Sequence, residues 1–183
     1  MVSLLRRRRE MMQAENKRLY LFNNGYENSE ITGGWRNYGF NMSGFSPACT
    51  IGQTIALSFG VKPTSAAAVS ASTTNPIDLR PFTKLVVEYD ATIKGGAGNC
   101  WVYLPLVLKN SINQQGAFGS DYSSRRLNVA NNIDVGSVSV EHGIASFNIS
   151  DYDDAPYICL NLNTWGKVQD IPAFTIYQMY LEQ

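Results

Sequence analysis

The sequence predicts an all-β protein, an antiparallel β-sandwich or jelly roll preceded by a short N-terminal α-helix. Three observations support this prediction. Short runs of alternating apolar and polar residues follow one another, turn residues separate them roughly every ten positions, and no later segment has helical length and periodicity. With 183 residues, of which 44% are hydrophobic and 16% charged, the chain can bury one core. We therefore expect a helix over residues 1–18 and a sandwich domain over residues 19–183.

The first element is predicted to be a helix because residues 2–18 contain neither glycine nor proline, and Ser3 can cap its first turn. At about 3.6 residues per turn, its apolar residues gather on one narrow side. They are Leu4, Leu5, Met11 and Met12. A helix of this length with so narrow an apolar side is marginal in water, so it needs a partner. The sandwich itself, a second copy of the helix or a different protein could supply one.

Basic residues are concentrated in this N-terminal segment, which we call the leader. Residues 1–18 hold six basic and two acidic residues, a net charge of +4, and the rest of the chain holds nine and thirteen, a net charge of −4. Four of the basic residues are consecutive, namely Arg6, Arg7, Arg8 and Arg9. Consecutive arginines on a helix point in several directions, and no basic stripe occurs elsewhere. An acidic protein surface is therefore favoured over nucleic acid as the partner.

The strands of the sandwich are expected in nine segments rich in β-branched, aromatic and aliphatic residues. These segments are 19–22, 54–59, 67–71, 85–93, 100–108, 136–140, 144–149, 157–162 and 174–181. The polar stretch 109–132 is expected to be a long loop. His142 is expected at a hairpin tip between two of the strands.

The three cysteines, at positions 49, 100 and 159, lie far apart, without a CxxC pair or a neighbouring histidine. This spacing argues against a structural zinc site and favours buried free thiols, as in a protein made in a reducing cytoplasm. No apolar run approaches the roughly 18 residues of a membrane-spanning helix. The polar residues after the arginines also argue against a signal peptide.

No catalytic apparatus is predicted, because the sequence contains no nucleophile elbow and no phosphate-binding loop followed by a helix. A glycosidase pair could be drawn from Glu88, Asp90 and Glu141, but any β protein offers such carboxylates. We therefore expect no enzyme and no cofactor.

The densest acidic cluster consists of Asp151, Asp153 and Asp154, just before Pro156. Such a cluster could bind calcium, or its carboxylates could cap a turn before the next strand. The turn is favoured because no second carboxylate cluster is available to complete a calcium shell.

Aromatic residues offer the remaining chemistry. Trp35 and Trp101 are expected in the core, whereas a second pair of rings occurs in polar loops beside amides. A ring can stack on the C–H face of a pyranose while amides bind its hydroxyls. The candidate glycan contacts are Trp165, Tyr122, Asn161 and Asn163.

Two parts of the chain resemble known families. The Arg/Met-rich leader, followed by Leu19-Tyr20-Leu21-Phe22-Asn23-Asn24-Gly25 and Glu30-Ile31-Thr32-Gly33-Gly34-Trp35, resembles the opening of small virion-associated proteins of tailed phages and prophages of Gram-positive bacteria. The ending, from Ala145-Ser146-Phe147-Asn148-Ile149-Ser150 to Thr175-Ile176-Tyr177-Gln178-Met179-Tyr180-Leu181-Glu182, is similar to the last strands of jelly-roll carbohydrate-binding modules. No motif here fixes a ligand residue of those modules, so none is carried over.

The resemblance implies a non-enzymatic virion structural protein of the tail or head-fibre type, trimeric and assembled in the cytoplasm of a bacterial host. Other virion proteins would bind its leader, and a cell-surface glycan would bind its sandwich; neither nucleic acid nor a membrane is expected as a partner. Two alternatives stay open. One is a decoration protein that cements capsid or tail subunits without a ligand, and the other is a small polysaccharide-degrading enzyme.

Overall fold

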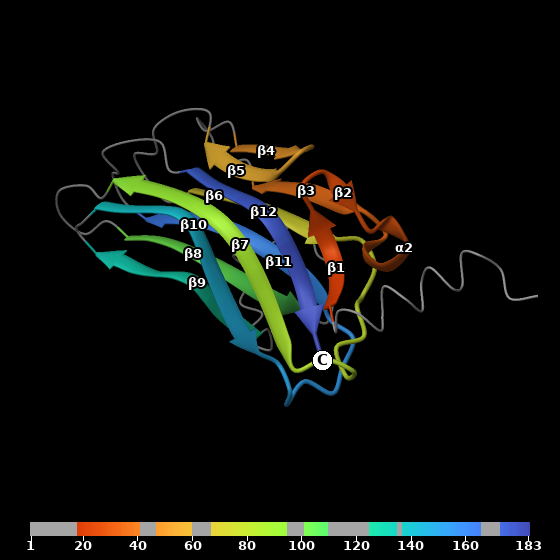
Figure 1. Cartoon of the computed structure of the whole chain (residues 1–183). Coiled ribbons are helices and arrows are strands. Elements are labelled where there is room, and N and C mark those ends of the chain that lie inside the picture. Colours follow the sequence, from red (N-terminus) through yellow and green to blue (C-terminus); the bar gives the residue numbers. More distant parts are fainter. Residues whose placement is uncertain are drawn as a thin grey trace, which may run out of the picture.

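The computed structural model describes residues 18–40, 47–59, 67–94, 101–109, 125–134, 137–165 and 173–183. In this part of the chain, two antiparallel sheets stack on each other and enclose one hydrophobic core (Figure 1). The predicted β-sandwich is thereby confirmed. The predicted N-terminal helix lies outside these residues, except for Arg18, which begins the first strand. None of the helices described is long and apolar enough to cross a membrane.

One sheet, sheet A, contains seven of the described strands. Its main path runs β10-β7-β12-β1-β2, and β5 pairs with both β12 and β4. These strands are β1 (Arg18–Asn23), β2 (Tyr26–Glu27), β4 (Pro47–Ile51), β5 (Ile55–Phe59), β7 (Lys84–Lys94), β10 (Ser137–Asn148) and β12 (Ala173–Glu182).

The opposing sheet, sheet B, contains five described strands in the order β3-β6-β11-β8-β9. They are β3 (Trp35–Phe40), β6 (Ala67–Thr73), β8 (Trp101–Lys109), β9 (Arg125–Asp134) and β11 (Tyr157–Trp165). β11 is thus the middle strand of sheet B, with two strands on either side.

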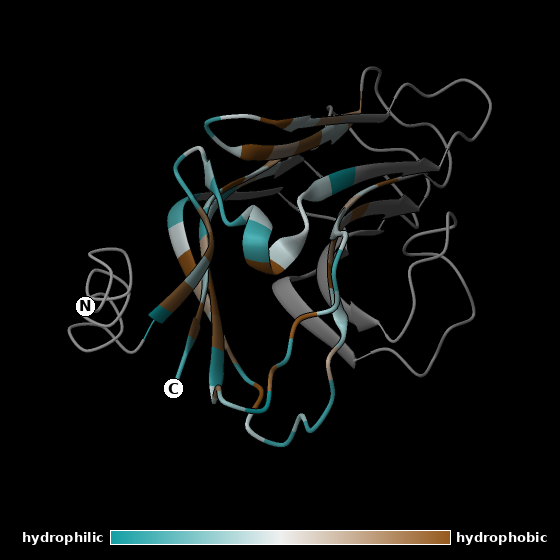
Figure 2. Ribbon diagram, turned by 90° about the vertical axis from the view of Figure 1, so that its right-hand side faces the viewer, coloured by the Kyte–Doolittle hydropathy of each residue, from teal (hydrophilic) through white to brown (hydrophobic). Residues whose placement is uncertain are grey.

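The core lies between the sheets because each strand turns every second residue toward it. In β5 the core residues are Ile55, Leu57 and Phe59, with 0–2% of their surface exposed, while the residues between them are half-buried. Figure 2 shows the same alternation of hydrophobic and hydrophilic residues along the coloured strands. Each fully buried aliphatic or aromatic side chain contributes about 1.5–3 kcal/mol of transfer free energy, so burial at this interface is the main stabilising term.

A single turn of helix, α2 (Ser29–Thr32), carries the chain from β2 of sheet A to β3 of sheet B. It ends at Gly33, whose φ of 66° is left-handed and whose N–H donates to the carbonyl of Ser29. The Thr32 carbonyl in turn accepts a hydrogen bond from the Thr74 N–H, at 2.8 Å, beyond the end of β6. Figure 2 shows α2 between the two sheets, where it closes one end of the core.

The start of β1 is held against the end of β12. Arg18 Nε lies 2.8 Å from Glu182 Oε1, and the guanidinium of Arg18 lies 4.6 Å from the ring centroid of Tyr180. The Tyr180 ring also packs against Tyr20, with 5.2 Å between centroids. The point where the leader joins the sandwich is therefore fixed to the strand that ends the described chain.

The predicted loop over residues 109–132 is partly wrong, because β9 begins at Arg125 and pairs with β8. Its sequence, Arg-Arg-Leu-Asn-Val-Ala-Asn-Asn-Ile-Asp, contains many polar residues, which are typical of an edge strand with solvent beside it.

The prediction that His142 occupies a hairpin tip is also wrong. β10 runs without interruption from Ser137 to Asn148, and the register shifts between Val140 and Gly143. His142 has a φ of 51° in this bulge, and its N–H donates to Asp90 Oδ1 at 2.8 Å. A residue in a bulge breaks the alternation of the strand, which makes one long strand resemble two short ones.

Candidate functional site

Three of the four candidate glycan contacts belong to β11, the middle strand of sheet B. The core positions of this strand are Ile158, Leu160 and Leu162, each 0% exposed. Successive residues of a strand alternate between its faces, so Asn161, Asn163 and Trp165 occupy positions on the other side. We call this side the non-core face of sheet B. The structure thus brings three predicted residues to one face of one strand.

The register with β8 adds two aromatic residues to this group. Asn163 is paired with Tyr103, and Trp165 is paired with Trp101. Residues that face each other across antiparallel strands share a face of the sheet. By register, positions 101 and 103 therefore share the non-core face, whereas the sequence predicted Trp101 for the core; the side chain of Trp101 is not among those that the structure describes. Trp35, by contrast, is buried at 6% exposure, as predicted.

A further row crosses the same face toward the opposite edge of the sheet. Ser70 of β6 is paired with Asn161 on one side and with Tyr38 of β3 on the other. The row thus joins a tyrosine position and an amide position across a small residue, about 10 Å apart at the usual strand spacing. The cue in the sequence was the alternation around Tyr38, which our prediction did not assign to a strand.

Part of the non-core face is covered. Ser70, Ser72 and Cys159 lie on it, yet only 2–4% of each is exposed. Ser72 Oγ is 3.0 Å from Cys159 Sγ, and Ser72 Oγ also donates to the Thr73 carbonyl. The aromatic and amide positions of β8 and β11 continue along the strands from this covered part, toward Trp165.

The residue types in these rows are mostly neutral. Positions 38, 70, 101, 103, 161, 163 and 165 contain aromatic, amide or hydroxyl side chains, and one carboxylate residue, Asp134 of β9, is paired with Trp101 at the end of its row. Such a set offers ring faces and uncharged hydrogen-bonding groups, and Asp134 has no second Asp or Glu among these paired positions with which to form a glycosidase pair.

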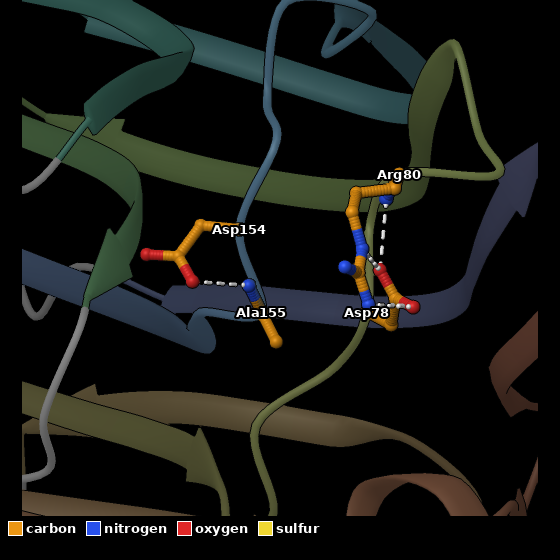
Figure 3. Close-up of polar contacts among 4 residues, drawn as sticks. All are labelled: Asp78, Arg80, Asp154 and Ala155. Carbon is orange, nitrogen blue, oxygen red and sulfur yellow. Dashed lines mark hydrogen bonds and ion pairs between the residues drawn. The ribbon is translucent and has the colours of Figure 1, made fainter.

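The acidic cluster before β11 forms a turn. Asp154 Oδ1 accepts a hydrogen bond from the Ala155 N–H at 2.7 Å (Figure 3). The Asp154 carbonyl accepts one from the Leu79 N–H in the neighbouring segment. Beside it, Arg80 binds both carboxylate oxygens of Asp78, which holds the pKa of Asp78 below its usual value. No group of three or more metal-binding side chains occurs in the described residues, and the capping role of Asp154 favours the turn over calcium.

The carboxylates considered as a glycosidase pair lie on sheet A. Asp90 accepts hydrogen bonds from the Tyr177 hydroxyl and from the His142 N–H, and these bonds lower its pKa. A general acid needs a carboxyl whose pKa is raised, so Asp90 does not suit that role. Glu88 lies two residues away on the same face of β7, and Glu141 is exposed in the bulge of β10. None of them lies on sheet B, where the aromatic and amide rows are.

The two described cysteines are free thiols, as predicted. Cys49 is half-buried, and burial raises the pKa of its thiol to about 11. Cys159 is buried on the non-core face beside Ser72. Cys100 lies outside the described residues.

Several predicted site residues also lie outside the described residues. They are Tyr122 and the leader residues Leu4, Leu5, Arg6, Arg7, Arg8, Arg9, Met11 and Met12. Their roles remain predictions from the sequence.

Comparison with known proteins gives neighbours among solved structures alone, since no family model and no curated protein sequence matches the chain. A family 29 carbohydrate-binding module from Piromyces equi is 15% identical, with a TM-score of 0.43, over 91% of this chain and 90% of that one. A family 11 module from Clostridium thermocellum, solved with a mixed-linked tetrasaccharide, is 10% identical, with a TM-score of 0.44, over 90% and 95%.

A third neighbour is a family 27 module, described for its specific mannan recognition. It is 11% identical to this chain, with a TM-score of 0.46, over 91% of this chain and 98% of that one. At identities of 10–15% and TM-scores below 0.5, these similarities assign neither a family nor a ligand to the protein.

Proposed function

We propose that this protein is a non-enzymatic, glycan-binding β-sandwich that uses the non-core face of sheet B. The observation that carries the proposal is the pairing of β11 with β8, which aligns Asn163 with Tyr103 and Trp165 with Trp101. An aromatic position beside an amide position, repeated on adjacent strands, offers what a sugar requires. The ring stacks on the apolar face of a pyranose, and the amide bonds to its hydroxyls.

The chemistry of this face favours a neutral glycan. The paired positions of β8 and β11 carry no acid or base, and the charged position next to them is Asp134 of β9, which is paired with Trp101. A carboxylate at this position disfavours a sulfated, phosphorylated or uronic-acid polymer, because like charges repel. Arg36 and Arg126 on the same face are paired with Ser72 and Val107 respectively, away from the aromatic end. Binding of a neutral glycan should consequently depend only weakly on salt.

We further propose that the leader holds the sandwich on a larger assembly, a phage particle of the tail or head-fibre type. The support is the leader's sequence, with a net charge of +4 and a narrow apolar side, and the resemblance of the first 35 or so residues to virion-associated proteins. The same segment would join copies into an oligomer, for which we expect a trimer. The decoration protein without a ligand is the second candidate, because the charge and the narrow apolar side of the leader would serve it equally.

A binding experiment separates these candidates. Purified full-length protein is applied to an array of neutral bacterial and plant glycans, and hits are titrated by calorimetry. We expect Trp165→Ala to weaken binding by at least about tenfold, the scale of one lost stacking interaction, and Asn163→Ala by a similar factor. Tyr26→Ala is the matched control, because Tyr26 is a 62% exposed aromatic residue on β2 of sheet A.

The outcomes are distinct. Loss of binding in the Trp165 and Asn163 variants, with unchanged thermal unfolding and an unaffected Tyr26 variant, supports the proposal. An array without hits, combined with tight binding to purified capsids or tails, supports the decoration protein instead. Release of soluble sugar from a bound glycan, abolished by one Asp or Glu substitution, would revive the polysaccharide-degrading enzyme.

A further inference from the structure

The non-core face of sheet A carries an exposed apolar residue surrounded by carboxylates. Ile144 of β10 is 71% exposed, and it is paired with Glu88 of β7. Asp90 follows Glu88 on the same face, and Glu141 is exposed in the bulge that precedes Ile144. We call Glu88, Asp90, Glu141 and Ile144 the Ile144 patch. A single exposed aliphatic residue is ordinary on a protein surface, and what distinguishes Ile144 is its place on an edge strand beside several carboxylates.

The patch also has a fixed shape. Tyr177 of β12 donates from its hydroxyl to Asp90, and its ring lies 5.8 Å from the ring of His142. The bulge of β10 therefore cannot shift freely relative to β7 and β12. The patch presents an apolar centre, a tyrosine ring and carboxylates on three neighbouring strands, a combination that suits a segment with both arginine and aliphatic side chains.

The chain's own leader has this composition. Arg6 to Arg9 lie between Leu4-Leu5 and Met11-Met12, so positive and apolar side chains alternate in short blocks. The charges are also complementary, with a net of +4 in residues 1–18 and −4 in the remainder. We infer that in the free protein the leader binds the Ile144 patch of the same chain, with arginines on the carboxylates and Leu or Met side chains over Ile144.

The length of the leader is sufficient for this contact. Arg18 is paired with Glu182, which is paired with Lys84, so Arg18 lies two strands from β7 and four residues below Glu88. At the usual spacings this corresponds to about 16 Å. The twelve residues from Arg18 back to Arg6 span about 18 Å as a helix and about 40 Å when extended. The arginines reach the patch in either form.

The leader is covalently joined to β1, and this tether favours binding of the patch by the leader of the same chain over binding by the leader of a second copy. A short tether gives an effective concentration on the order of millimolar, well above the micromolar concentrations of a purified protein. Attachment of the leader to another protein would then require its release from the patch. The contact is independent of the glycan site, since it lies on the opposite sheet.

Limited trypsin digestion of the full-length protein tests this inference, because trypsin cuts after the arginines that the patch would cover. The rate of the first cuts at Arg6 to Arg9 is followed by mass spectrometry in the wild type and in a variant with Glu88→Gln and Ile144→Ser. If the leader is bound about four-fifths of the time, cutting in the variant should be about fivefold faster, because proteolysis follows the open population. Raising the salt concentration should accelerate cutting of the wild type, after correction with a small trypsin substrate.

The control variant carries Glu30→Gln and Tyr26→Ser, which remove one exposed carboxylate and one exposed apolar residue from α2 and β2. Its cutting rate should equal that of the wild type, and thermal unfolding of both variants should confirm that they are folded. Equal rates for wild type and patch variant would overturn the inference. Protection that grows over a roughly hundredfold range of protein concentration would overturn it too, because the leader would then occupy the patch of a neighbouring copy.

Discussion

The hydroxyl of Tyr177 on β12 donates a hydrogen bond to the carboxylate of Asp90 on β7, at the level where both neighbouring strands are irregular. The pairing of β12 with β7 shifts between Ile176 and Gln178, and β10 shifts against β7 nearby. The other oxygen of Asp90 accepts the N–H of His142 in the β10 bulge. One carboxylate therefore satisfies donors from two bulges and fixes the register of three strands.

We expect Tyr177→Phe to lower the free energy of unfolding by about 1 kcal/mol, because it removes one hydrogen bond to a charged acceptor that is partly exposed. Urea unfolding followed by fluorescence measures the change. Tyr26→Phe is the control, since Tyr26 is exposed on β2 and should tolerate the loss of its hydroxyl. Equal stabilities for the two variants would show that the bulges do not depend on this bond.

The same carboxylate should make stability depend on acid pH. Its hydrogen bonds hold the pKa of Asp90 below its usual value, the Tyr177 bond contributing most. A carboxyl with a depressed folded-state pKa contributes stability that is complete above its unfolded pKa, near 3.9, and is lost as the pH falls through the folded value. The stability difference between wild type and Asp90→Asn should therefore be constant from about pH 6 to pH 5 and shrink below about pH 4. A difference that persists unchanged to pH 2.5 would contradict this assignment.

Gly33→Ala should destabilise the sandwich by about 1–2 kcal/mol. The φ of Gly33 is +66°, and an added Cβ would lie 2.5 Å from Cγ and Oδ1 of Asn75. The exposed Asn75 side chain can move aside, so backbone strain accounts for most of the cost. Gly52→Ala provides the matched control, since no atom lies within 4 Å of a Cβ there, and it should be neutral in thermal unfolding.

Cys49 should react slowly with iodoacetamide in the native state. Burial raises the pKa of its thiol from 9.0 to about 11, so at pH 8 the thiolate is roughly a hundredfold scarcer than for an exposed cysteine. Quantitative mass spectrometry of the Cys49 peptide, with and without denaturant, measures the difference. Labelling that is equally fast under both conditions would mean that β4 opens readily from sheet A.

The sequence predicted the fold where strand alternation is uninterrupted, as in residues 54–59 and 85–93. The prediction failed where a bulge shifts the alternation of inward-facing and outward-facing residues along a strand. At His142 one left-handed residue made β10 resemble two strands with a tip between them. β9 was missed for another reason, since an edge strand needs few apolar residues and its polar sequence resembles a loop.

The candidate site was predicted in part. Asn161, Asn163 and Trp165 were chosen for their residue types, and the common face follows from their spacing of two. The partners Trp101 and Tyr103 depend on the register between β8 and β11, which is set by packing across the whole sheet. Trp101 was expected in the core because a tryptophan in an apolar run is usually buried, and the apolar sequence of β8 conceals which of its faces is inward.

The pairing of Arg18 with Glu182 places the start of β1 beside the end of β12. Arg18 and Glu182 are neighbours at one end of the sandwich, and β7 ends and β12 begins at the other end (Figure 1). A label or fusion partner joined after residue 183 would therefore lie beside the start of β1. New chain ends made at the opposite end, with residues 18 and 183 linked by a short peptide, would leave both sheets continuous and separate the leader's role from the sandwich's.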